Sequence, residues 1–141
     1  MIELKRLTDA FILLKKEAKE DTKSVDKANV DNNFNMSALH FKWLDYLHEW
    51  RRVKKALDSM KKRTIRDLYT YYTTEFDIKL TSKDQIFLYI EADDKYINLN
   101  EKYEISKDII EFCISVSKIL ENKQWEIKNY LDWLKYSNGM N

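Results

Sequence analysis

Proline is absent from this sequence, and its only glycine, Gly139, lies close to the C-terminal end. Proline and glycine are the strongest local breakers of regular structure, so this chain offers few positions for tight turns. The composition predicts long helices and argues against a sheet-rich fold. It also excludes glycine-rich phosphate loops of the P-loop or dinucleotide-binding kind, and with them the NTPases and Rossmann enzymes.

Cysteine is nearly absent as well, since Cys113 is the only one. A single cysteine excludes an intramolecular disulfide and fits a reducing compartment. Because Cys113 lies between Phe112 and Ile114 in an apolar stretch, we expect a small core residue rather than a nucleophile.

Histidine is scarce too. His40 and His48 are the only histidines, eight residues apart, with no second ligand pair at metal-site spacing, so structural roles are favoured over a zinc site. The acids Glu91, Asp93 and Asp94 could form a carboxylate metal site, but acids at a helix entry explain them more simply. We predict no catalytic residue, no metal and no cofactor, and therefore not an enzyme.

The chain has no apolar run of membrane-spanning length, and its first six residues do not lead into a signal-peptide core. A soluble, intracellular protein without membrane contact is expected. Its 25 Lys and Arg residues and 24 Asp and Glu residues nearly balance overall. The balance hides a strongly basic block between residues 51 and 66, which predicts a localised anion-binding surface.

This basic block lies on a stretch with helical periodicity from Trp50 to Tyr72. Apolar residues recur there at steps of three to five, as on a helix with one buried face. Basic side chains on the other side suit a phosphate backbone, although a solvated helix face is the simpler alternative. Tyr69, Tyr71 and Tyr72 end the helix and cannot all face inward, so at least one could stack on unpaired bases, although packing is favoured for each of them. Tyr69 is the one we name as a candidate. The basic candidates are Arg51, Arg52, Lys54, Lys55, Lys61, Lys62, Arg63 and Arg66.

The pattern predicts a single domain, all-α, in three segments. Residues 1–36 form a short helix capped by Thr8, followed by a polar linker from Asp21 that could become helical in its second half. Residues 37–73 form the basic helix. Residues 82–138 form a C-terminal helical region that begins at Ser82 as an N-cap. A strand is the competing interpretation of 86–90, because a short apolar run has no decisive period.

The C-terminal region shows a coiled-coil-like apolar seam. One set of residues is spaced by four, three, four and three, and resumes after a step of eight: Ile105, Ile109, Phe112, Val116, Ile119, Ile127, Tyr130 and Leu134. A second apolar edge would remain exposed in a monomer, which predicts self-association. That edge comprises Ile110, Ile114, Leu120, Leu131 and Trp133.

From Leu39 to Gly139 the sequence resembles the UvsY family, the recombination mediators of T-even-like phages. The resemblance rests on short motifs in common order and spacing: Lys42-Trp43-Leu44, Arg51-Arg52, Lys61-Lys62, Tyr71-Tyr72, Ala92-Asp93, Leu99, Phe112-Cys113, Ile127-Lys128 and Gly139. It implies a ring- or open-barrel-like homo-oligomer, heptameric in the family. The family's DNA-contacting basic pair falls on Arg66 and Leu68. The second position is not basic here, so Arg63 or Lys62 would supply that charge.

The resemblance also implies the partners. These are single-stranded DNA, a UvsX-like recombinase loaded by the mediator, and the phage single-strand-binding protein that must be displaced. The expected location is the cytoplasm of the infected bacterial host. The alternative from another class is a coiled-coil adaptor whose basic helix binds an acidic protein.

Overall fold

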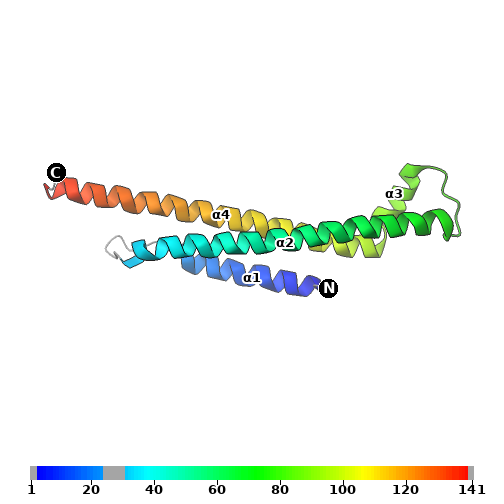
Figure 1. The fold of residues 1–141 in the computed structure, drawn as a ribbon, viewed down its shortest axis with the longest axis horizontal. Helices are drawn as coiled ribbons and strands as arrows, with labels where there is room; N and C mark the ends of the chain where they lie inside the picture. Colours follow the sequence, from blue (N-terminus) through cyan, green and yellow to red (C-terminus); the bar gives the residue numbers. More distant parts are fainter. Residues whose placement is uncertain (1–2, 24–30, 140–141) are drawn as a thin grey trace. The chain divides into compact units, whose positions relative to one another are not determined.

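A computed structural model of the chain describes residues 3–23 and 31–139, with only the backbone for 31–34. In this part of the chain four helices and no strand are found (Figure 1). The helices are α1 (Leu4–Asp21), α2 (Asp31–Thr74), α3 (Lys83–Glu91) and α4 (Asp94–Ser137). The expected all-α class is confirmed, and the competing strand at 86–90 is wrong because that run lies within α3.

The first two helices begin earlier than the sequence-based expectations. Thr8 does not cap α1, which begins four residues earlier, and its hydroxyl instead donates a hydrogen bond to the carbonyl of Leu4 at 3.0 Å. Helix α2 begins at Asp31, ahead of position 37, so residues 31–36 of the predicted linker are helical, as the sequence allowed. Residues 24–30 of that linker lie outside the described residues. Helix α2 ends at Thr74, one residue beyond the expected end, and the hydroxyls of Thr70, Thr73 and Thr74 donate hydrogen bonds to carbonyls one turn earlier.

Helix α3 begins where its sequence predicts. The side chain of Ser82 accepts a hydrogen bond from the backbone N–H of Gln85 at 3.3 Å, as an N-cap does. Asp84 lies in the first turn, where a negative charge is favourable near the helix N-terminus. Two isoleucines of this short helix, Ile86 and Ile90, are buried, so α3 is attached by its apolar face.

The long helices contribute to two compact units. The first unit comprises Met1–Asp9 and Trp50–Asp108, and the second comprises Ala10–Glu49 and Ile109–Asn141. In the first unit, the end of α2 packs against α3 around a core of Leu68, Tyr72, Ile86 and Ile90. This unit contains all the predicted DNA-binding residues.

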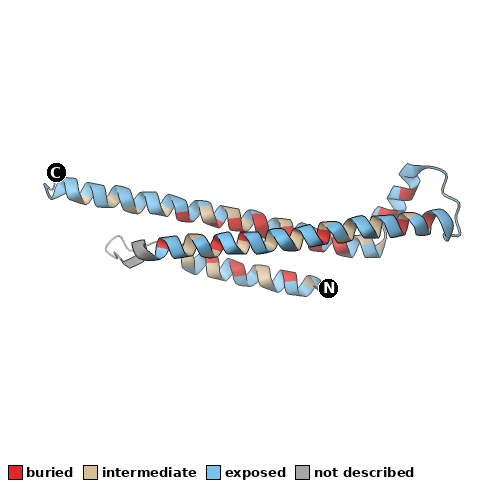
Figure 2. Cartoon of the chain, viewed as in Figure 1, coloured by how far each residue is buried: buried red, intermediate tan, exposed pale blue. Residues whose placement is uncertain are grey.

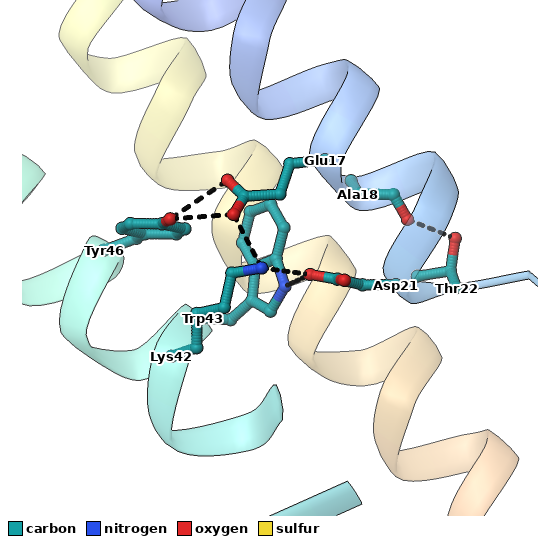
Figure 3. Close-up of polar contacts among 7 residues, drawn as sticks. All are labelled: Glu17, Ala18, Asp21, Thr22, Lys42, Trp43 and Tyr46. Atoms are coloured by element: carbon teal, nitrogen blue, oxygen red, sulfur yellow. Dashed lines mark hydrogen bonds and ion pairs between the residues drawn. The ribbon is translucent and has the colours of Figure 1, made fainter. Parts of the chain in front are cut away.

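In the second unit, helices α1, α2 and α4 pack around Trp43, which is fully buried. The Phe112 ring of α4 makes edge-on contacts with Trp43 and with Phe11 of α1, at centroid distances of 6.3 and 5.6 Å. The indole N–H of Trp43 donates to the Asp21 carboxylate at 2.9 Å (Figure 3). The buried indole is therefore hydrogen-bonded as well as packed.

A cluster of polar side chains joins α1 to α2 in this unit (Figure 3). The Lys42 ammonium lies 2.6 Å from Glu17 and 2.7 Å from Asp21, and the Tyr46 hydroxyl donates to Glu17 at 3.0 Å. Burial lowers the pKa of Lys42, but its hydrogen bonds to both carboxylates outweigh burial and raise the pKa overall. The pKa of Tyr46 is raised by burial and by its hydrogen bond to Glu17.

Buried, intermediate and exposed positions follow one another along α4 (Figure 2), and the buried ones match the predicted seam only in part, with Ile109 and Val116 buried as predicted. Ile110 and Leu120, expected on an exposed edge, are buried, whereas Ile119 of the predicted seam is 44% exposed. The seam prediction was wrong at these positions. In the second unit α4 contacts both α1 and α2, so its buried surface is wider than a two-helix seam and displaced around the helix. Leu131 and Trp133 are exposed, as expected.

Candidate nucleic-acid interface

The basic residues of α2 do not all lie on one surface. Leu57, Leu68 and Tyr72 define the buried side of this part of the helix. An α-helix turns about 100° per residue, so residues at intervals of three, four, seven and eleven share a side. Six basic side chains are exposed, and they form what we call the basic ridge: Arg51, Arg52, Lys55, Lys62, Arg63 and Arg66.

The positive charge of the basic ridge is only partly compensated. Lys62 lies 3.3 Å from Asp58 and Arg66 lies 3.0 Å from Asp67. These pairs are largely exposed and therefore weak, so a phosphate could replace the acidic partner at little cost. Among the described residues, no ion pair or hydrogen bond engages the side chains of the other four ridge members, Arg51, Arg52, Lys55 and Arg63.

Two predicted residues, Lys54 and Lys61, are half-buried and directed toward α4. The Lys61 ammonium donates a hydrogen bond to the side-chain oxygen of Asn100 at 2.9 Å. It also lies 4.2 Å from the centroid of the Tyr103 ring, and the Lys54 ammonium lies 5.8 Å from the same centroid. The structure therefore separates the eight basic candidates into six ridge residues and two lysines that contact α4.

The tyrosines at the end of α2 differ in their availability for stacking. Tyr69, the predicted stacking residue, is half-buried against the core of the first unit, with its ring 6.2 Å from that of Phe87. Tyr71 is 42% exposed, although its ring contacts Phe76 at 6.1 Å. Tyr71 is therefore more exposed than Tyr69 and Tyr72. The sequence alone could not indicate which of these three closely spaced tyrosines is exposed.

Leu68 lies at the second position of the basic pair implied by the family resemblance. Its side chain is only 6% exposed and belongs to the core of the first unit. Leu68 therefore cannot contact a strand in this fold. Arg66 is exposed, and so are Lys62 and Arg63, the residues expected to supply the missing charge.

Other chemistry has little support in the described part of the chain. No group of three or more His, Cys, Asp or Glu residues there could hold a metal ion. Cys113 is fully buried, and burial raises the pKa of its thiol to about 11, which does not suit a nucleophile. No helix among the described residues is long and apolar enough to cross a membrane.

An all-helical chain with an exposed, incompletely paired cationic ridge belongs to the class of proteins suited to contacting a phosphate backbone without reading bases. The particular family follows from comparison with known proteins. The profile described as "Recombination, repair and ssDNA binding protein UvsY" matches residues 14–140, and the chain belongs to this family. A comparison with curated proteins gives no match.

Solved structures show the same fold. A crystal structure of the bacteriophage T4 recombination mediator protein UvsY, lattice type IV, is similar with a TM-score of 0.79 at 16% identity, over 90% of this chain and 98% of that one. The lattice type II structure gives a TM-score of 0.78 at 16% identity, over 98% of this chain and 99% of that one. The resemblance to the UvsY family is therefore confirmed.

Proposed function

We propose that this protein is a recombination mediator that binds single-stranded DNA through the basic ridge of α2. The observation that carries the proposal is the ridge itself, with six exposed cationic side chains on one stretch of helix. Four of them have no acidic partner among the described residues. Contacts of this kind are made to phosphates and are independent of base sequence, as required of a protein that acts on any single strand.

The family description, which covers recombination, repair and ssDNA binding, supports this activity. We further propose that the protein helps a UvsX-like recombinase to assemble on DNA covered by the phage single-strand-binding protein, in the cytoplasm of the infected host. Its working form would be a ring or open-barrel homo-oligomer, a heptamer by resemblance. Such an assembly would present several ridges to one strand and bind it with high avidity.

The second candidate function is an adaptor whose basic ridge binds an acidic protein. The same exposed charges favour it, because carboxylates pair with Arg and Lys as phosphates do. The two functions differ in their response to DNA. An adaptor would bind single strands weakly, and its interaction would require a folded acidic partner.

Fluorescence-anisotropy titration of labelled oligo-dT at several salt concentrations tests the proposal. The test variant replaces four ridge residues by alanine: Lys55→Ala, Lys62→Ala, Arg63→Ala and Arg66→Ala. Each basic residue that contacts a single-strand phosphate contributes about 0.7 to the slope of log affinity against log salt. The variant should bind more weakly, with a slope flatter by up to about 3 if all four make contact.

A matched control replaces exposed lysines outside the basic ridge, Lys16→Ala and Lys19→Ala on α1. Circular dichroism should show both variants folded, since the positions are exposed and alanine favours helix. The control should bind oligo-dT as the wild type does. If the folded ridge variant binds with unchanged affinity and slope, the ridge is not the DNA site. If the wild type binds an acidic protein but scarcely binds oligo-dT, the adaptor is correct.

A further inference from the structure

The side chain of Tyr103 on α4 has three lysines around it. The ammonium groups of Lys61, Lys54 and Lys107 lie 4.2, 5.8 and 5.9 Å from the centroid of its ring. Two of these lysines come from α2 and one from α4, and all belong to the first unit. We call these four residues the Tyr103 cluster.

The cluster concentrates positive charge with little to offset it. Attraction between each ammonium group and the ring face is modest at partly exposed sites. The hydrogen bond from Lys61 to Asn100 adds a neutral acceptor and no negative charge. The one ion pair that a cluster lysine makes within the described residues joins Lys107 to Glu104 at 3.7 Å, and both side chains are about half exposed. Among the described residues, the three lysines around the Tyr103 ring therefore have a single, weak acidic partner.

The surroundings make this site different from the basic ridge. Lys54, Lys61 and Tyr103 are half-buried, so water and salt screen their charges less than those of the fully exposed ridge residues. The Asn100 hydrogen bond holds the Lys61 ammonium near the Tyr103 ring before any ligand arrives. A group held in place loses less conformational entropy when it binds.

We propose that the Tyr103 cluster is a second phosphodiester-binding site, through which a single strand extends from the basic ridge onto α4. Lys54 and Lys61 are adjacent in sequence to the ridge residues Lys55 and Lys62, so one strand can contact both surfaces. In this site Lys54, Lys61 and Lys107 bind backbone phosphates, and the Tyr103 ring keeps the three ammonium groups near one another. The inference rests on the proposed function, and it adds α4 residues that the sequence pattern did not indicate.

Lys107 and Glu104 provide opposite tests. Lys107→Ala removes one phosphate contact, so it should weaken oligo-dT binding and flatten the salt slope by about 0.7. Lys107→Arg should restore both. Glu104→Gln releases Lys107 from its only acidic partner in the described structure and should tighten binding. A merely structural ion pair would give the same result for both removals. A general charge effect would give opposite shifts as well, so the site also requires that loss of another lysine on the same helix leaves affinity unchanged.

Lysine acetylation supplies a readout that does not depend on affinity. With oligo-dT bound, Lys107 should be protected from an acetylating reagent, whereas the exposed Lys95 near the start of the same helix should not be. Lys95→Ala serves as the matched affinity control. Glu104 and Lys95 are exposed and Lys107 is only half-buried, so circular dichroism should be unchanged in these variants.

The outcomes separate this inference from the proposed function. If the ridge variant loses binding while Lys107→Ala and Glu104→Gln bind as the wild type does, and Lys107 is unprotected, the second site is overturned and the ridge stands. If the wild type does not bind oligo-dT, both are overturned. Opposite shifts for Lys107→Ala and Glu104→Gln, together with protection of Lys107, establish the site.

Discussion

The hydroxyl of Tyr72 is the clearest example of a single polar group fixed by its surroundings. It donates a hydrogen bond to the Asp93 carboxylate at 2.7 Å, and the ring is buried in the core of the first unit. This hydrogen bond, with burial, raises the pKa of Tyr72 from its ordinary value of 10.0 to about 12. Asp93, which the sequence offered as a member of an acidic cluster, is thus a structural acceptor next to the start of α4.

Stability should therefore fall at alkaline pH. The folded state favours the neutral phenol, so the contribution of Tyr72 is complete below pH 10 and is lost as pH rises toward about 12. Tyr72→Phe removes a hydrogen bond to a charged group and should destabilise the protein by about 1.5–3 kcal/mol at neutral pH. Urea unfolding at neutral pH and above pH 10 measures both effects. The difference between wild type and variant should shrink at high pH, and a constant difference would contradict the assignment.

Cys113 should be chemically silent in the folded protein. Its side chain is fully buried, and burial raises the pKa of the thiol from 9.0 to about 11. Both effects suppress the reactive thiolate. Ellman's reagent should react slowly with the native protein and at once in denaturant. Because this is the only cysteine, the signal has a single source. Rapid reaction of the native protein would show that the second unit opens readily.

At the scale of helices, sequence reasoning succeeded where a local signal was decisive. Ser82 and Asp84 mark the beginning of α3, and a chain without proline forms helices of 44 residues. Sequence reasoning was partly wrong about which side of α4 is buried. The spacing of its apolar residues fits several neighbouring sides of the helix, and the helices packed against α4 decide which of them is buried. The prediction that Thr8 caps α1 was wrong for a related reason. A threonine hydroxyl can cap a helix or donate a hydrogen bond to a carbonyl one turn earlier in the same helix.

The same reasoning explains which candidates for the site were found. Eight basic residues on α2 are visible in the sequence, but the turn of Lys54 and Lys61 toward Tyr103 depends on α4, a partner distant along the chain. Nothing in the sequence pattern around Lys107 indicated a role in binding. Long-range packing, and not composition, separates the basic ridge from the Tyr103 cluster.

A pair of neighbouring residues on α4 tests the corrected stripe. Leu120 is fully buried, so Leu120→Ala should destabilise the protein by about 2–5 kcal/mol through lost burial and the cavity left behind. Ile119 is 44% exposed, and Ile119→Ala should change stability by no more than about 0.5 kcal/mol. Thermal or urea unfolding of both variants gives the comparison. Equal losses, or a larger loss at Ile119, would restore the originally predicted seam.

At the scale of the whole molecule, the last part of α4 exposes large aromatic side chains among its polar residues. Trp125, Trp133 and Tyr136 are 58%, 60% and 80% exposed. Large aromatic side chains exposed together on one segment mark an interaction surface. The proposed homo-oligomer would cover this surface, and by repeating the basic ridge and the Tyr103 cluster it would bind a single strand with an affinity that one protomer cannot reach.

Self-association should depend on this segment. Sedimentation velocity at micromolar protein should show a species well above the 17.1 kDa of one chain. The double variant Trp133→Lys and Tyr136→Lys places charges on this aromatic surface, where their burial in an interface would be costly, so it should shift the protein to monomer. Its helix content should be unchanged because both residues are exposed. The neighbouring substitution Asp132→Ala removes no apolar area and should leave the assembly intact.

A wild type that sediments as a monomer at every concentration would refute the oligomer. If both variants assemble like the wild type, the subunits associate through another surface, and the exposed aromatics of α4 must then contact a different partner.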